Sequence, residues 1–233
     1  MSWLLKSSIG KKLIMSVTGV ALILFLLFHA AMNVTAVFSE DAYNAICALL
    51  GANWYAVAGT GALGALVAIH FIYALILTLQ NRKARGSDAY AINVRPKHVE
   101  WASQNMLVLG IIVVGFMVLH LSQFWYKMMF VELMGHHEVE LGGKIVSPQD
   151  GAEFIKYYFS QLWVVIAYCI WYIALWFHLS HGFWSALQTV GWSNTIWMNR
   201  WKVIGQIIAT ITCLAFAFVT IYFYARHYFC LGA

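Results

Sequence analysis

The sequence predicts an all-α integral membrane protein in which five helices cross a bilayer. Three observations support this: the composition is apolar, five long stretches carry no charge, and the charges between them are unevenly distributed. Hydrophobic residues make up 62% of the 233 residues and charged residues only 10%, whereas a soluble domain carries about 25% charged residues. The length suits a single membrane domain, residues 1–233, and leaves no room for a second globular one.

Five apolar stretches are each long enough to cross the hydrocarbon core of a bilayer as a helix. The predicted spans are Leu13–Val37, Asn53–Leu79, Ser103–Tyr126, Phe159–Leu187 and Val203–Tyr224. None of the five contains Asp, Glu, Lys or Arg. The first stretch is too long for the apolar part of a signal peptide, so we expect it to be retained as the first span.

The charges between the spans predict the orientation of the chain. Loops rich in Lys and Arg stay in the cytoplasm, so we expect a cytoplasmic N-terminus and a C-terminus outside. The same distribution argues against nucleic-acid binding, because the basic residues follow membrane topology and form no soluble basic face. The basic residues on the N-terminal side are Lys6, Lys11, Lys12, Arg82, Lys83, Arg85, Arg95, Lys97, Arg200 and Lys202. The acidic residues on the opposite side are Glu40, Asp41, Glu132, Glu138, Glu140, Asp150 and Glu153.

The cysteines form no recognisable ligand or redox pattern. No CxxC or CxxCH occurs, which argues against a zinc ribbon and against haem attached through thioethers. We interpret them as small buried hydrophobic residues. They are Cys47, Cys169, Cys213 and Cys230.

Histidine occurs in each of the first four predicted spans, where an imidazole is costly unless it is paired, hydrogen-bonded or bound to a metal. A rise of about 1.5 Å per residue places His29 and His120 roughly 24–26 Å from the cytoplasmic end. The same rise places His70 and His178 roughly 14 Å from that end. The histidines therefore form two layers about 10 Å apart, each with two histidines from different helices.

Two imidazoles that face each other across a helix bundle suit bis-histidine ligation of haem iron. We predict an outer haem between His29 and His120 and an inner haem between His70 and His178. The alternative for each is a core histidine hydrogen-bonded to a neighbouring helix, but four in two matched layers favour haem. His181, one turn closer to the cytoplasm than His178, stays open as the inner ligand or as a partner of a propionate, carbonyl or water.

Short motifs surround the four histidines. They are Ser16-Val17-Thr18-Gly19 with Leu27-Phe28-His29, Ile69-His70-Phe71-Ile72-Tyr73, Leu119-His120-Leu121, and Phe177-His178-Leu179-Ser180-His181-Gly182-Phe183-Trp184-Ser185-Ala186 running on to Gly191-Trp192. Together they resemble the cytochrome b subunit of succinate:quinone oxidoreductases that has five helices and two haems. The fourth motif is the most specific, and the likeness covers nearly the whole chain.

The resemblance implies the ligands and the cofactors. Two b haems would be held by the same two pairs. His178 is favoured over His181 because the family's ligand precedes a Ser-x-Gly-x-Trp pattern, as His178 does here. Ser16 would lie near a propionate of the inner haem. One departure concerns proton transfer: where some relatives have a glutamate two residues before the fourth-helix ligand, this chain has Trp176, so that route lacks its carboxylate.

The resemblance also implies the partners and the location. The chain would anchor a succinate dehydrogenase or fumarate reductase in the inner (cytoplasmic) membrane of a bacterium. A flavoprotein and an iron–sulfur protein would dock on the basic face, and electrons would pass through the haems to or from a quinone, often menaquinone in two-haem members. A quinone needs an apolar slot with one or two polar groups. The candidates are Asn33, Ser39, Glu40, Gln123 and Trp125, although each also suits an interfacial polar or aromatic residue.

Other functions stay open. The chain could be the di-haem cytochrome b anchor of a hydrogenase or formate dehydrogenase, although the fourth motif argues against it. A haem-free transporter is disfavoured because the spans contain neither carboxylates nor interruptions. A zinc site at His136 and His137, in the longest loop, is a further alternative.

Overall fold

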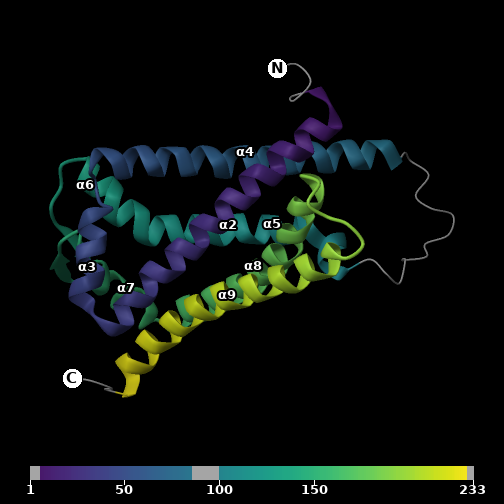
Figure 1. Ribbon diagram of the computed structural model, residues 1–233. Helices are drawn as coiled ribbons and strands as arrows, with labels where there is room; N and C mark the ends of the chain where they lie inside the picture. Colours follow the sequence, from purple (N-terminus) through teal and green to yellow (C-terminus); the bar gives the residue numbers. More distant parts are fainter. Residues whose placement is uncertain (1–5, 86–99, 230–233) are drawn as a thin grey trace.

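The protein is a bundle of long helices joined at one end by a compact cap (Figure 1). The computed structural model describes residues 6–85 and 100–229. Within these residues five helical segments are long and apolar enough to cross a membrane, which confirms a multi-pass helical membrane protein. They are α2 (Ser8–Phe38), α4 (Trp54–Arg85), α5 (Trp101–His120) continued by η1 (Leu121–Phe130) and α6 (Val131–Leu133), α8 (Leu162–Thr189) and α9 (Trp197–Phe229).

Four of the long helices form a ring. Going round it, α2 packs against α4, α4 against α5, α5 against α8, and α8 against α2. The last helix, α9, lies outside this ring and packs against α8 and α2, while α2 runs obliquely across the others (Figure 1). The diagonal pairs of the ring, α2 with α5 and α4 with α8, do not pack along each other.

Helix α4 is the least covered member of the ring. Of its residues 54–84, whose burial the structure describes, only Ala56 is buried. A Cβ built at Gly59, Gly61 or Gly64 meets nothing within 4 Å. Small residues of this kind can admit a neighbouring helix or a flat ring.

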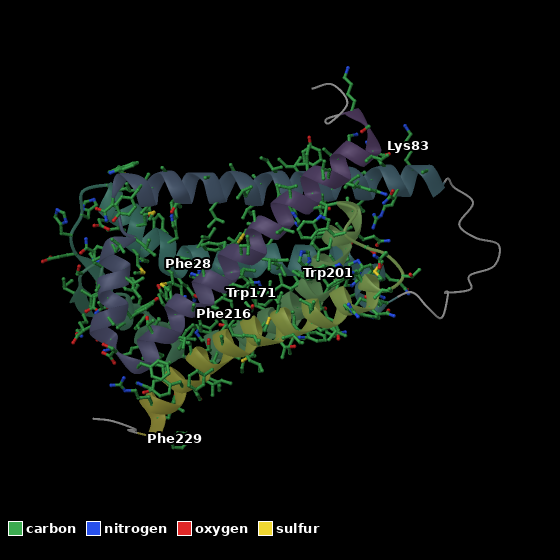
Figure 2. The ribbon with its side chains drawn as sticks, in the orientation of Figure 1. Phe28, Lys83, Trp171, Trp201, Phe216 and Phe229 are labelled. Atoms are coloured by element: carbon green, nitrogen blue, oxygen red, sulfur yellow. The ribbon has the colours of Figure 1, made fainter. Side chains whose placement is uncertain are left out.

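The two ends of the bundle differ in charge. One end, which we call the basic end, is formed by the start of α2, the end of α4 and the start of α9. Figure 2 labels Lys83 and Trp201 at this end. Its described basic residues include Lys11, Lys12, Lys83, Arg200 and Lys202. Arg95 and Lys97, which also enter the predicted charge asymmetry, lie outside the described residues. Which side of a membrane this end faces stays a prediction from charge.

The other end, the capped end, is closed by four short elements. They are α3 (Glu40–Leu49), the hairpin of β1 (Val139–Leu141) and β2 (Lys144–Val146), and α7 (Gly151–Phe159). Gly142 and Gly143 join the strands with φ of +62° and +86°, the signs that a two-residue hairpin turn needs. The hairpin packs its apolar side chains over the fully buried Phe154 of α7. These two short strands were not predicted from the sequence.

Polar contacts hold the cap to the spans. Asn44 of α3 donates to Asp150 Oδ1 at 2.7 Å and accepts from the Ala152 amide at 2.9 Å. Glu132, at the end of the third span, accepts from the Ala52 amide at 3.0 Å and from the Gln149 side chain. Three of these four hydrogen bonds are partly shielded from water and are therefore costly to leave unmade, so they fix α3 and α7 against the helix ends.

Two local features depart from the predicted spans. The third span changes from α-helix to π-helix directly after His120, over Leu121–Phe130. The predicted start of the fourth span at Phe159 is wrong, because Phe159 ends α7 and the span begins only at Leu162. Between them Gln161 has an extended backbone. Hydrophobicity continues across this break and therefore concealed it.

Candidate metal centres

The outer pair of histidines consists of His29 on α2 and His120 at the end of α5. Their ring centroids lie 5.8 Å apart and the ring planes are inclined by 83°. With metal–nitrogen bonds of about 2 Å, two imidazoles on opposite sides of one metal ion have centroids about 6 Å apart. The separation therefore suits a single ion held between the two rings.

The inner pair consists of His70 on α4 and His178 on α8. Their ring centroids lie 6.4 Å apart and the planes are inclined by 69°, again a separation that suits one shared ion. Like the outer pair, this pair joins diagonal helices that do not otherwise pack along each other. Each pair therefore meets in the core of the helix ring, where bundles hold cofactors.

Two glycines show that the two pairs lie at different levels. A Cβ built at Gly19 of α2 would lie 3.1 Å from His70 Cε1, and one at Gly110 of α5 would lie 3.7 Å from His178 Cε1. His29 follows Gly19, and His120 follows Gly110, by ten residues, or about 15 Å along each helix. This distance along the helix axis is longer than the layer separation of about 10 Å expected along the membrane normal. A tilted helix covers less depth than its own length, which brings the two values closer together.

One histidine of each pair bonds a buried hydroxyl group through Nδ1. His70 Nδ1 lies 3.1 Å from Thr18 Oγ1, and that hydroxyl lies 2.8 Å from the Ile14 carbonyl, to which it donates. His120 Nδ1 lies 3.3 Å from the Tyr168 hydroxyl. A hydroxyl that donates elsewhere accepts from the imidazole, which leaves Nε2 unprotonated and free to bind a metal. Sequence reasoning missed both Thr18 and Tyr168, whose only signal was a hydroxyl within an apolar span.

The other two histidines have different surroundings. The Asn33 amide nitrogen lies 3.5 Å from His29 Nδ1 and 3.4 Å from Nε2, and it donates to the His29 carbonyl at 2.8 Å. His178 Nδ1 is buried without a hydrogen-bond partner among the described residues. Because a buried imidazole nitrogen needs a partner, an acceptor near His178 would complete this site.

Aromatic rings surround the outer pair. Phe25 stacks on His29 at 5.4 Å, and Phe216 of α9 lies 5.7 Å from the same ring. Phe124 and Trp171 lie 5.2 and 5.7 Å from His120. Figure 2 shows Trp171 and Phe216 well inside the bundle, between Lys83 at one end and Phe229 at the other. Such a shell excludes water and suits a large planar apolar group.

His181 and Ser16 have partners of their own. His181 lies one turn beyond His178, and its Nδ1 is 3.5 Å from Glu100 Oε2, an ion-pair distance rather than a hydrogen bond. The ring that meets His70 is that of His178. Ser16 is buried and donates to the Lys12 carbonyl of its own helix at 2.9 Å.

Glu100 links the fourth and fifth spans at the basic end. Its carboxylate lies 2.7 Å from Lys202 Nζ, besides its contact with His181. Burial works against the charged form of Glu100, but Lys202 and His181 outweigh it and lower the pKa of the carboxyl. Glu100 is therefore ionised at neutral pH and links the end region of α8 and the start of α9 to the start of α5.

The quinone candidates lie in two separate places. Asn33 adjoins His29 and accepts from the Tyr43 hydroxyl at 3.3 Å, while the buried Gln123 accepts from Tyr168 beside His120. Trp125, on η1 as well, has a buried indole nitrogen without a partner in the described residues. Ser39 and Glu40 instead line a surface hollow at the capped end, together with residues of α9. The structure thus brings Asn33 and Gln123 to the outer pair and places Ser39 and Glu40 at the surface.

Glu40 connects three helices through ion pairs. Its carboxylate lies 2.9 Å from Lys156 Nζ on α7 and 2.6 Å from Arg226 on α9. Burial works against the charged form, but the two cations outweigh it and lower the pKa of Glu40 below its ordinary value of 4.5. A folded-state pKa below the unfolded value means that this stabilisation is complete above about pH 4.5 and is lost as the pH falls through the folded pKa.

We expect Glu40→Gln to destabilise the capped end in a pH-dependent way. The variant loses both ion pairs, which for partly exposed groups are worth about 1 kcal/mol or less each. Thermal unfolding of the detergent-solubilised protein should show a lower midpoint than wild type at about pH 7 and a smaller difference at about pH 4, which lies below the ordinary pKa of 4.5. Asp41→Asn, at the exposed neighbouring position, is the matched control. An equal deficit at both pH values would contradict the ion-pair explanation.

Comparisons with known proteins add no further constraint: no family model, no curated protein and no solved structure matches this chain. The described residues hold no group of three or more His, Cys, Asp or Glu that could bind a metal ion. Among these residues, therefore, the alternative zinc site at His136 and His137 has no third ligand of these types. This finding does not bear on haem, whose iron takes at most two protein ligands because the porphyrin supplies the others.

Proposed function

We propose that this chain is the membrane anchor of a succinate:quinone oxidoreductase, a succinate dehydrogenase or fumarate reductase, which binds two b haems and passes electrons between an iron–sulfur protein and a quinone. The observation that carries the proposal is that two pairs of imidazoles meet in the bundle. Each pair joins diagonal helices at a separation that suits one metal ion. The sequence resemblance supplies the enzyme class.

The residues of the site fit a haem at each pair. Gly19 keeps side-chain bulk away from the inner pair, since a Cβ there would lie only 3.1 Å from His70 Cε1, and aromatic side chains surround the outer pair. Bound haem would supply reversible one-electron transfer. The chain itself would hold the two irons through the histidine pairs, keep water away from them, and fix which imidazole nitrogen faces the metal.

The basic end suits the docking of an iron–sulfur protein. Its cations would attract an acidic partner surface, and the inner pair, beside Gly19 near the start of α2, is the closer of the two to this end. The outer pair lies further along α2 and α5, towards the capped end. Electrons would therefore enter or leave the soluble subunits at the inner haem.

A quinone would bind beside the outer pair. Trp125 offers a buried indole N–H without an acceptor among the described residues, and Asn33 offers an amide next to His29. A quinone carbonyl is an acceptor of the kind that an unpaired buried donor requires. Trp125, as a buried donor without a described partner, and Asn33, through its position beside His29, are therefore better candidates than Ser39 and Glu40. Ser39 caps α3 by accepting from the Ala42 amide, and Glu40 is held by two cations. Menaquinone is the quinone we propose.

The test of the proposal is the identity of the subunits that co-purify with the chain from its native membrane. We expect a flavoprotein and an iron–sulfur protein, and the complex should couple succinate oxidation or fumarate reduction to a quinone. Recovery of hydrogenase or formate dehydrogenase subunits would replace the enzyme class while leaving the haem sites in place. A complex without any redox subunit would overturn the proposal.

A further inference from the structure

A buried hydrogen-bond chain leads away from His120. The Tyr168 hydroxyl lies 3.3 Å from His120 Nδ1 and donates to Gln123 Oε1 at 2.9 Å. Tyr168 and Gln123 are only 3% and 5% exposed, so water does not replace either contact. We call these three residues the Tyr168 chain.

The direction of the Tyr168 chain follows from proton counting. A phenol hydroxyl has one proton, and Tyr168 uses it to donate a hydrogen bond to Gln123. Towards His120 the hydroxyl can then act only as an acceptor, so His120 Nδ1 carries the proton and Nε2 presents its lone pair. His29, the other member of the outer pair, has a different neighbour at 3.4 to 3.5 Å, the Asn33 amide nitrogen, which is a donor.

The acceptor of the Tyr168 chain, Gln123, lies on the π-helix. Leu121–Phe130 begins directly after His120 and carries Gln123. Segments of π-helix are rare and occur frequently at functional sites. From this segment the buried Gln123 side chain reaches α8, where it accepts the hydrogen bond from Tyr168.

We propose that Tyr168, supported by Gln123, is a positioning residue that makes His120 a stronger electron donor and thereby lowers the reduction potential of the outer haem; this rests on the proposed function. An acceptor on the outer ring nitrogen raises the basicity of a metal-bound imidazole. A more basic ligand favours the ferric form of the iron. Reduction of a haem iron held there would add one electron to the iron, while no bond within the Tyr168 chain would break and each proton would stay on its atom.

A packing role for Tyr168 makes a different prediction. Its ring also contacts Phe159, Trp171 and Tyr172, so a purely structural role would be carried by the ring. Tyr168→Phe keeps the ring and removes the hydroxyl. The reduction potential therefore separates the two roles.

The matched control is Tyr172→Phe. Tyr172 lies one turn further along α8, is buried, and bonds Thr220 Oγ1 at 2.8 Å. It also packs against Trp171 and Phe216 of the same aromatic shell. Its hydroxyl is directed to α9 rather than to His120, so removal of that hydroxyl should not change the potential of either haem.

The experiment is potentiometric titration of the purified, haem-containing chain with haem quantitation in parallel. For Tyr168→Phe we expect both haems to be kept and the outer potential to rise by about 30–60 mV, a three- to tenfold change in the one-electron equilibrium. The inner potential and both potentials of Tyr172→Phe should stay unchanged. A His178→Ala background, which is expected to retain the outer haem alone, assigns the titration step.

The outcomes separate the two proposals. A wild-type chain without haem overturns the proposed function and this inference with it. Haem-loaded Tyr168→Phe with an unshifted outer potential, or with the shift also seen in Tyr172→Phe, overturns this inference alone. If Tyr168→Phe does not keep the outer haem, Gln123→Leu decides, because it keeps the tyrosine ring and removes the acceptor of its proton. An unchanged outer potential in Gln123→Leu then also overturns the inference.

Discussion

Replacement of His178 by alanine should remove the inner haem, whereas replacement of His181 should leave it in place. His178 is the α8 histidine whose ring meets His70, at 6.4 Å between centroids. His181 lies one turn further along, with its Nδ1 turned to Glu100. Groups that hydrogen-bond to a ligand typically change metal affinity by about 10- to 100-fold, and loss of a ligand itself should exceed that.

The measurement is the haem content of each purified variant, with the spectrum of the reduced protein. His178→Ala should retain half of the wild-type haem, and His181→Ala all of it. His181→Ala is the matched control, because it removes an imidazole from the same helix and nearly the same face. Full haem in His178→Ala and half in His181→Ala would reverse the assignment of the inner ligand.

Replacement of His120 by alanine should remove the outer haem and interrupt electron transfer at the capped end. His120 and His29 are the only histidines in contact at that level of the described bundle, and their aromatic shell offers no substitute ligand. His29→Ala should give the same result, because either loss leaves a single imidazole. Both variants should keep the inner haem, whose ligands come from α4 and α8.

The readout for this second prediction is reduction of the remaining haem by a quinol, followed spectroscopically. Quinol should reduce both haems in wild type. In His120→Ala the rate at which quinol reduces the inner haem should fall by more than about 100-fold, the upper range for indirect effects on a ligand. His227→Ala is the control, because His227 is exposed at the capped end of α9. Rapid quinol reduction of the inner haem in His120→Ala would contradict entry through the outer pair.

The spans could be predicted because the bilayer imposes one strong condition on them. A helix that crosses it needs a long apolar stretch, and all five predicted stretches lie largely within the observed helices. The histidine pairing could be anticipated for a related reason. Antiparallel helices of known rise place residues at calculable depths, and His29 with His120 and His70 with His178 lie within contact in the structure.

The cap and the supporting hydrogen bonds could not be predicted in the same way. Hydrophobicity does not distinguish α-helix from π-helix, so η1 left no signal in the sequence. Thr18 and Tyr168 reach histidines that are 52 and 48 residues away along the chain, and only the packing of α2 against α4 and of α5 against α8 brings them together. The break at Gln161 lies within a continuous apolar run, which explains the wrong start of the fourth span.

That each histidine pair holds one haem is tested most directly by a reduced-minus-oxidised spectrum of the purified chain, combined with chemical quantitation of haem per polypeptide. We predict two low-spin b haems per chain, each with two histidine ligands. A purified, folded chain that contains no haem would contradict the account.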